Sequence, residues 1–137
     1  MRYYLSLGAN LGNREQTIRK AIQGIEQQIG LVTRCSSFYY SEPWGFDSEH
    51  AFCNNCCLLE TDKQPIEVLH STQSIEQELG RTHKSANGTY CDRTIDIDII
   101  SIFDGEKEIT IDTAELQVPH PLWEQRDFVV KPLQEIL

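Results

Sequence analysis

The chain has 137 residues, 39% of them hydrophobic, and a formal net charge of −9 at pH 7. This length suffices for one well-packed core and is too short for two ordinary domains, so we expect a single domain over residues 1–137. The acidic balance argues against nucleic-acid binding, which depends on a basic surface. An anionic ligand would need a local basic cluster.

No apolar run is long enough to cross a bilayer, and the chain begins with a strand-like segment at 2–7 rather than a basic and then apolar leader. We therefore expect a cytoplasmic protein without membrane contact. We also expect a monomer. Five cysteines are an odd number, and alternation along 52–60 sends Cys53 and Cys56 to opposite faces. Free thiols in a core or at a sheet edge fit this pattern better than a zinc site or a disulfide framework.

The first half of the chain predicts strands and one helix. A strand over about 2–7 leads into a turn-rich segment in which Asn13 caps a helix ended by Gly30. The apolar residues of this helix recur at helical spacing and are Ile18, Ala21, Ile22, Ile25 and Ile29. Strands follow over about 31–40 and 52–60.

The second half begins with a helix opened by Pro65 and ended by Gly80. A polar loop over 81–92 then delivers the chain to a strand that ends near Ile100. Beyond it we expect a short strand near 107–111, a proline-bounded turn at 118–121 and a return to the sheet at 128–130. The order βαββαβ matches an α+β, ferredoxin-like sandwich: an antiparallel sheet with both helices on one face, an open opposite face and additional C-terminal elements.

The most informative segment is 92–100, in which acids alternate with isoleucines. Asp96 and Asp98 project from one face of an extended strand with Cα atoms about 6.6 Å apart, while Ile95, Ile97 and Ile99 enter the core. Paired Asp residues in a strand normally need a compensating cation. Hard oxygen ligands at this spacing suit Mg²⁺, whose remaining sites are filled by water and phosphates. The alternative is an ordinary solvent-exposed face of a sheet.

Basic residues bracket the two acids, namely Arg81, His83, Lys84 and Arg93. Cations beside metal-bound carboxylates are typical of a nucleoside triphosphate site. Taken alone, His83 and Lys84 are better explained as ordinary surface charge, whereas Arg93, three residues before Asp96, is harder to explain in that way. No GxxxxGK[ST] motif is present, so phosphoryl transfer would need another architecture.

Two further groups are candidates. His120 and Arg126 follow the predicted turn, and His120 is placed to cap a short helical turn opened by Pro121. Phe52 and Asn54 share one side of a strand, where an aromatic ring and an amide could bind a flat heterocycle. Placement of the aromatic residues in the core is an equally good interpretation.

These residues together resemble the 6-hydroxymethyl-7,8-dihydropterin pyrophosphokinase family of folate biosynthesis over nearly the whole chain. The matching segments are 7–12, 36–39, 43–45, 52–54, 75–76, 80–81, 118–120, 126–128 and the signature Arg93-Thr94-Ile95-Asp96-Ile97-Asp98-Ile99. The resemblance implies a ferredoxin-like enzyme that transfers pyrophosphate from ATP to the pterin hydroxymethyl oxygen, giving AMP.

The resemblance also implies roles for individual residues. The catalytic group would be Arg81, Arg93, Asp96 and Asp98, with Asp96 and Asp98 holding two Mg²⁺ ions. Nucleotide-binding residues would be Glu76, Arg81, His83, Arg93, Ile99, His120 and Arg126. Pterin-binding residues would be Ser41, Pro43, Trp44, Gly45, Phe52, Asn54, Asp96 and Phe128, with the two phenylalanines as a sandwich.

The chain departs from the family pattern in the loop over 81–92. His83 stands where some members carry arginine, Tyr90 where many carry tryptophan, and Cys91-Asp92 replaces a small residue and proline. A histidine is only partly charged near neutral pH, so a contact between His83 and phosphate would strengthen as pH falls.

Two rival functions stay open at this point. An RNA-binding module on the same fold would need aromatic residues on the central strands and a basic surface. The acidic balance of the chain and the paired Asp residues on a central strand argue against it. A small-molecule regulatory domain without turnover would explain the aromatic and amide group but leaves the acid pair and its arginines unexplained.

Overall fold

The computed structural model describes residues 1–10, 12–41, 52–81 and 95–137, without the side chains of Ser41 and Arg81. Its strands are β1 (Arg2–Ala9), β2 (Leu31–Cys35), β3 (Tyr39–Ser41), β4 (Phe52–Glu60), β5 (Asp96–Asp104), β6 (Lys107–Ile109), β7 (Ile111–Asp112) and β8 (Gln117–Val118). Its α-helices are α1 (Arg14–Gln28), α2 (Pro65–Glu76) and α3 (Asp127–Ile136). A π-helical turn spans Gln77–Arg81 and a 3₁₀ turn spans Trp123–Gln125.

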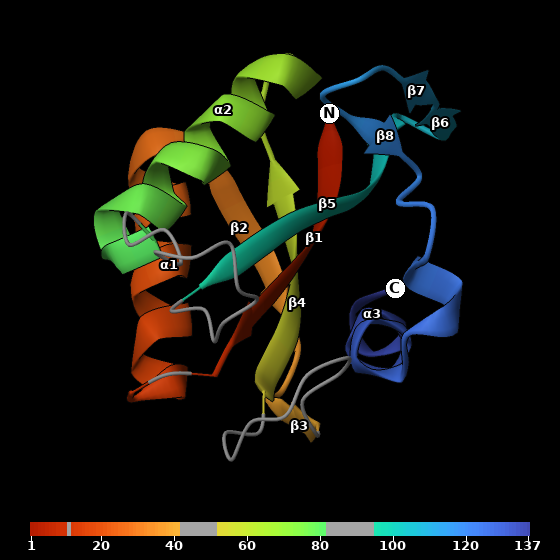
Figure 1. Ribbon diagram of the computed structural model, residues 1–137. Helices are drawn as coiled ribbons and strands as arrows, with labels where there is room; N and C mark the ends of the chain where they lie inside the picture. The colour runs from red at the N-terminus through yellow and green to blue at the C-terminus, as the bar shows by residue number, and fades with distance from the viewer. Residues whose placement is uncertain (11, 42–51, 82–94) are drawn as a thin grey trace.

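The main sheet is open and antiparallel, with the order β2-β4-β1-β5-β6 and β3 paired to β4 (Figure 1). The strand β1 lies at its centre and pairs along its whole length with β4. Its pairing with β5 is interrupted between Tyr4 and Leu5, where β5 carries one extra residue, Ile100. This β-bulge lets Ile100 face the same side as Asp96 and Asp98 without displacing Ile102 from the core.

The helices α1 and α2 cover one face of the sheet, as the sequence predicts (Figure 1). Asn13 caps α1 by accepting a hydrogen bond from the Gln16 amide at 3.2 Å. Gly80, with φ at 112°, interrupts the helical geometry of the turn after α2 in a conformation that favours glycine. The core beneath the helices includes Leu5, Leu7, Ile18, Ile25, Leu59, Val68, Ile75, Ile95, Ile97 and Ile99.

The opposite face is not open along its whole length, because α3 packs against it. The prediction of a strand at 128–130 is therefore wrong. Buried residues of α3 recur at helical spacing, at Val129, Pro132, Leu133 and Ile136, and they cover Cys56 and Ile100. The burial of these apolar side chains of α3 against the sheet outweighs the β-propensity of residues 128–130.

A carboxylate fastens α3 to the sheet edge. Glu135 accepts hydrogen bonds from the Ser37 amide at 2.8 Å, the Ser37 hydroxyl at 2.6 Å and the Tyr39 hydroxyl at 2.5 Å. These bonds hold α3 beside β3 and leave the end of the sheet that carries Asp96 uncovered by α3 within the described residues (Figure 1).

The single strand predicted over 31–40 is broken into β2 and β3. The cause is Ser36, whose hydroxyl accepts a hydrogen bond from the Cys56 amide at 2.9 Å in place of the carbonyl that regular pairing would use. Similarly, the strand predicted near 107–111 is two strands: β6 extends the main sheet, whereas β7 pairs with β8 in a small second sheet.

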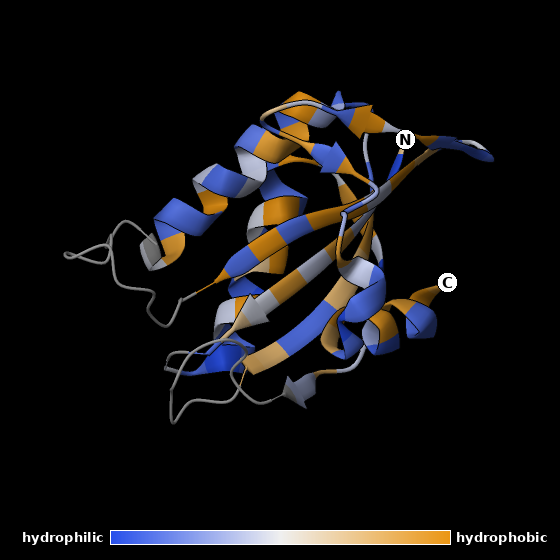
Figure 2. Cartoon of the chain, turned by 45° about the vertical axis from the view of Figure 1, so that its right-hand side comes forward, coloured by the Kyte–Doolittle hydropathy of each residue, from blue (hydrophilic) through white to orange (hydrophobic). Residues whose placement is uncertain are grey.

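The result is an α+β fold with an antiparallel sheet between unequal layers of helix. Hydrophobic and hydrophilic positions alternate along strands of the sheet (Figure 2), and buried residues form one apolar cluster on each of its faces. No helix among the described residues is long and apolar enough to cross a membrane. The four described cysteines are free thiols, three buried and one exposed, and Cys53 and Cys56 face opposite sides, as predicted; Cys91 lies outside the described residues.

Candidate functional site

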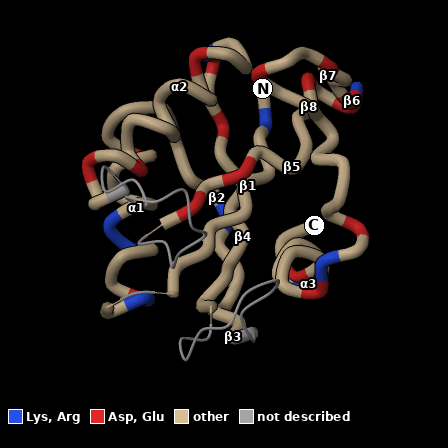
Figure 3. The backbone as a smooth tube through the Cα atoms, in the orientation of Figure 1, with Lys and Arg blue, Asp and Glu red and all other residues tan. Residues whose placement is uncertain are grey.

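The acid pair lies at the start of β5, where alternation separates it from the core. Ile97 and Ile99 are 6% and 4% exposed beneath the helices, while Asp96 and Asp98, which alternate with them, are half-buried on the opposite side. Figure 3 shows acidic positions along β5. The predicted alternation is confirmed, and both carboxylates sit on the face that α3 covers only in part.

A row of residues crosses three strands beside Asp96. Gly8 of β1 is paired with Asp96 on one side and with Asn54 of β4 on the other. Asn54 is 3% exposed, and a Cβ atom added to Gly8 would lie 2.7 Å from its Oδ1 atom. The Asn54 amide therefore lies over Gly8, in space that exists because residue 8 has no side chain.

Two aromatic residues belong to the same face. Phe52 precedes Asn54 by two positions on β4, so both project toward the α3 side, where Cys56 and Leu58 are packed. Phe128, at the start of α3, packs against the same apolar cluster, and the Arg126 guanidinium lies 5.8 Å from its ring centroid. Both rings are half-buried.

His120 is attached to β5 by its backbone. Its amide donates to the Ile100 carbonyl at 2.9 Å, and its Nδ1 atom accepts from the Leu122 amide at 3.3 Å. The bond from the Leu122 amide to Nδ1 supports the predicted capping role of His120. Because Nδ1 accepts this bond, the neutral imidazole ring carries its proton on Nε2. The pKa of His120 is lowered, first by burial and then by the positive charge of Arg126, while the Asp96 carboxylate opposes both. The fold thus brings His120 within electrostatic range of Arg126 and Asp96.

Glu76 lies at the end of α2 and reaches the free edge of β5. It is 5% exposed, and its Oε2 atom accepts a hydrogen bond from the Ile97 amide at 2.8 Å. Because Ile97 stands between Asp96 and Asp98, this carboxylate braces the acidic segment. The buried side chain of Ile99 faces the helices, so any contact that Ile99 makes on the acidic side comes from its backbone.

The remaining predicted site residues lie outside the description. Pro43, Trp44, Gly45, His83 and Arg93 fall on residues that the structure does not describe. Of Ser41 and Arg81 only the backbone is described: Ser41 pairs with Phe52, and Arg81 ends the turn after α2.

Sequence reasoning missed Gly8, which it placed in a turn. The strand β1 in fact continues to Ala9, and Gly8 is its contact point with Asn54. A glycine inside a strand often marks a close approach of another group, and this signal was available in the sequence.

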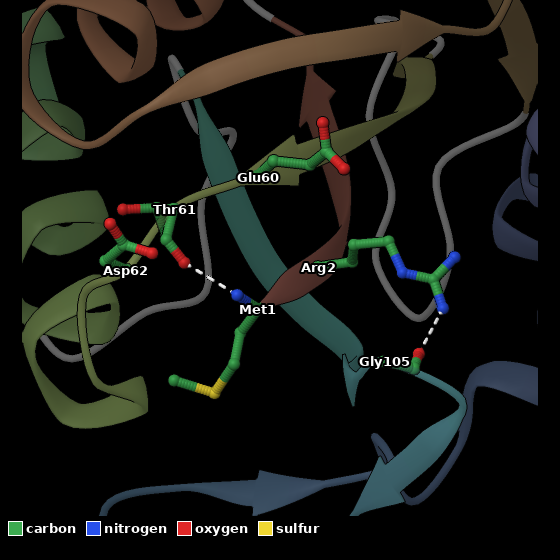
Figure 4. Close-up of a pocket in the computed structure, with 6 residues that line it drawn as sticks. All are labelled: Met1, Arg2, Glu60, Thr61, Asp62 and Gly105. Atoms are coloured by element: carbon green, nitrogen blue, oxygen red, sulfur yellow. Dashed lines mark hydrogen bonds between the residues drawn. The ribbon is translucent and has the colours of Figure 1, made fainter.

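A polar pocket of about 430 Å³ lies at the other end of β1 and is lined by Met1, Arg2, Glu60, Thr61, Asp62 and Gly105 (Figure 4). Its two cations are engaged by backbone carbonyls: the Met1 ammonium donates to Thr61 at 2.9 Å and Arg2 to Gly105 at 2.6 Å. The pocket is therefore distinct from the acidic site, which faces the Ala9 end of the strand.

Comparisons with known proteins identify the family of the chain. A family model described as 7,8-dihydro-6-hydroxymethylpterin-pyrophosphokinase matches residues 4–137. A Porphyromonas gingivalis protein named 2-amino-4-hydroxy-6-hydroxymethyldihydropteridine pyrophosphokinase is 44% identical over 135 residues, covering 97% of this chain and 88% of the relative. Proteins of the same name from Bacillus subtilis and Aquifex aeolicus are 40% and 39% identical, over 97% of this chain and 76% and 78% of their own lengths. The chain belongs to the 7,8-dihydro-6-hydroxymethylpterin-pyrophosphokinase family.

Proposed function

We propose that this chain transfers pyrophosphate from ATP to 6-hydroxymethyl-7,8-dihydropterin in folate biosynthesis, giving the pterin diphosphate and AMP. Membership of the family supports this function, and so do the names of the relatives. The observation that carries it in the structure is the row of Asp96, Gly8 and Asn54, which sets a carboxylate for the phosphate end beside an amide for the heterocycle. A regulatory domain without turnover gives no reason for this arrangement and is not favoured.

The proposal includes Mg²⁺ held by Asp96 and Asp98. No group of three or more His, Cys, Asp or Glu residues suited to a metal occurs among the described residues. Two half-buried carboxylates on one face fit a hard ion that takes few protein ligands and completes its shell with water and phosphate. When bound, two such ions would neutralise charge on the ATP phosphates and polarise the transferred group.

We assign nucleotide contacts to the residues around the acid pair. His120 can donate from Nε2, and Arg126 is fixed beside Phe128, so both offer donors to phosphoryl oxygens. Glu76 acts by holding the edge of β5, and Ile99 through its backbone. Arg81, Arg93 and His83 complete this proposed group.

The pterin would lie between Phe52 and Phe128, with Asn54 reading its amide edge. A flat heterocycle stacks well on aromatic rings, and a buried carboxamide supplies both a donor and an acceptor. Asp96 borders this subsite and the metal subsite, so the hydroxymethyl oxygen would lie near the transferred group. Ser41, Pro43, Trp44 and Gly45 would close the subsite.

Catalysis then rests on position and charge. His120 Nδ1 is occupied by the Leu122 amide, so we give His120 the role of donor rather than general base. Positively charged and hydrogen-bonding groups aimed at the phosphates stabilise the charge that develops during phosphoryl transfer. Holding both substrates in line removes much of the entropic cost of their encounter.

We also propose that the fold is ferredoxin-like, that residues 1–137 form a single domain and that the protein is a monomer. The strand order β2-β4-β1-β5, with α1 and α2 on one face, supports the ferredoxin-like assignment once β2 and β3 are counted as one interrupted strand.

The decisive experiment follows nucleotide products by chromatography after mixing the protein with Mg-ATP, with and without 6-hydroxymethyl-7,8-dihydropterin. AMP that appears only with the pterin, together with a pterin diphosphate, is the expected result. ADP would indicate a conventional kinase. Binding of either ligand without turnover would move the assignment to a regulatory domain.

A further inference from the structure

Two thiols face each other across the edge of the sheet, away from the acid pair. Cys35 of β2 is directly opposite Cys57 of β4, and their Sγ atoms are 3.6 Å apart. The neighbouring residues Ser36 and Cys56 form the next cross-strand pair, and the Ser36 amide donates a hydrogen bond to the Cys56 carbonyl at 2.9 Å. Cys35 and Cys57 therefore form a non-hydrogen-bonded pair, the position at which side chains of antiparallel strands come closest.

The two thiols differ in access. Cys35 is exposed on an edge strand, whereas Cys57 is 0% exposed within the core beneath the helices. The hydrogen bond from Cys57 lowers the pKa of the Cys35 thiol, against the opposing effects of burial and of Glu26. The same bond and burial raise the pKa of Cys57. Cys35 is thus the thiol that meets a reagent first, and Cys57 is its nearest sulfur.

The other described cysteines are shielded from this pair. Cys56 faces the opposite side of the sheet, where its thiol donates to the Val129 carbonyl of α3 at 3.7 Å. Cys53 is fully buried, and burial raises its pKa. Neither Cys53 nor Cys56 lies directly opposite an exposed cysteine, as Cys57 does.

We propose that Cys35 and Cys57 form a modification site that accepts a small-molecule disulfide such as oxidised glutathione and closes into a β2–β4 cross-strand disulfide. The Cys35 thiolate attacks one sulfur of the reagent and releases one glutathione thiolate. Cys57 then attacks the Cys35 sulfur of the mixed disulfide, and its proton passes to the departing glutathione thiolate, which leaves as the second glutathione thiol. Two protein thiols are oxidised by two electrons, and one reagent disulfide is reduced to two thiols.

Closure needs side-chain rotation more than backbone movement, because the two Cα positions are already paired across the sheet. The bond would tie together the ends of the segment 36–56, which contains β3 and the start of β4. The inference stands on these contacts and is independent of the proposed function.

The test uses the full chain carrying Cys91→Ser, because Cys91 lies outside the described residues. The protein is incubated with oxidised glutathione, quenched with acid, alkylated under denaturing conditions and digested with chymotrypsin, which cleaves after Phe38 and Phe52 and so separates Cys35 from the other cysteines. Mass spectrometry should find the Cys35 and Cys57 peptides joined, in a protein two hydrogens lighter. Cys53, Cys56 and Cys57 lie on one peptide, so fragmentation of the joined peptides should place the link on Cys57 and the alkyl groups on Cys53 and Cys56.

Variants make the outcome specific. Cys35→Ser should abolish the loss of two hydrogens, whereas Cys56→Ser should leave it unchanged. A stable glutathione adduct on Cys35 with Cys57 alkylated would overturn the proposal, as would a link between other cysteines. The oxidised parent should also unfold at a higher urea concentration than the reduced parent, since the cross-link restricts the unfolded chain. A lower midpoint would mean that the native sheet does not accommodate the bond.

Discussion

Asp96 and Asp98 are the residues on which the chemistry depends most. Replacing either by Asn keeps its size but removes the negative charge that a divalent cation requires, so kcat/KM should fall by about a hundredfold or more. Steady-state kinetics over a range of Mg²⁺ concentrations would measure this loss. Asp104→Asn, at the far end of the same strand, should behave like the parent. Nearly full activity of both Asn variants would remove the metal-ligand assignment.

Gly8 acts through the space that it leaves for Asn54. In Gly8→Ala the added Cβ atom would lie 2.7 Å from Asn54 Oδ1 and must displace the amide. If Asn54 binds the pterin as proposed, the displaced amide loses its hydrogen bonds to the pterin. This loss costs about 1–3 kcal/mol, or roughly a five- to hundredfold weaker affinity for the pterin, while the affinity for ATP is retained.

Isothermal titration with each substrate separately would measure the two affinities. Gly24→Ala is the matched control, because its Cβ would meet Ile75 at an ordinary 3.4 Å in a helix that favours alanine. Equal losses for both substrates in Gly8→Ala would point to general damage to the sheet instead.

His120 offers a direct electrostatic test of the site. Arg126 lowers its pKa, so Arg126→Gln should raise the value measured by NMR in the absence of metal and nucleotide, whereas Lys131→Gln on the exposed side of α3 should not. The depressed pKa also contributes stability above about pH 6.5, the pKa of an unfolded histidine, and this is lost as pH falls through the folded value. A His120 pKa unchanged by Arg126→Gln would place the guanidinium elsewhere.

At the scale of elements, Glu76 joins the end of α2 to the acidic segment of β5. Glu76→Leu would leave the buried Ile97 amide without this acceptor and should cost about 1–3 kcal/mol of unfolding free energy along with activity. Glu76→Gln retains an oxygen acceptor and should lose much less of both.

Urea denaturation and kcat, measured on both variants, separate two roles for Glu76. A bracing role predicts that stability and kcat fall together in the leucine variant. If the glutamine variant is stable but as inactive as the leucine variant, the carboxylate charge acts on the nucleotide itself.

The elements that could be predicted from the sequence are those whose signal is local. The stripe of α1 and the alternation of β5 each place their residues on a face without reference to the rest of the chain, so the positions of Asp96 and Asp98 follow from spacing alone. Alternation along β4 likewise predicts correctly that Phe52 and Asn54 lie on one side of that strand.

The errors arise where tertiary contacts decide. An aromatic residue and two valines at 128–130 favour a strand, yet the segment is helical because its later residues seal the second face of the sheet. The break between β2 and β3 depends on the two hydrogen bonds between Ser36 and Cys56, which lies 20 positions later on β4. The role of Gly8 likewise requires knowledge of which residue lies beside it on β4.

At the scale of the whole molecule, the site draws on the N-terminal strand, the central strands and α3. These segments share two apolar clusters on the two faces of one sheet, so we expect them to unfold together. Calorimetry should show one transition, with equal calorimetric and van 't Hoff enthalpies of about 100 kcal/mol near 60 °C for 137 residues.

Mg-ATP should move this transition upward as a unit, because a ligand of the native state stabilises every part of a cooperative domain. Two separable transitions, only one of which responds to ligand, would contradict the proposal of a single domain.

The irregular pairing of β1 with β5 also bears on how the chain tolerates changes in its length. The extra residue of β5, Ile100, is the one whose carbonyl receives the His120 amide. Deleting Ile100 would leave Asp96, Asp98 and Ile102 on their present faces, because regular alternation would resume across the gap. The strand would survive while the attachment of the histidine would be lost. A single residue, Ile100, thus attaches the segment that carries His120 to the main sheet. A relative whose strand lacks the residue equivalent to Ile100 should hold the histidine equivalent to His120 by a different contact.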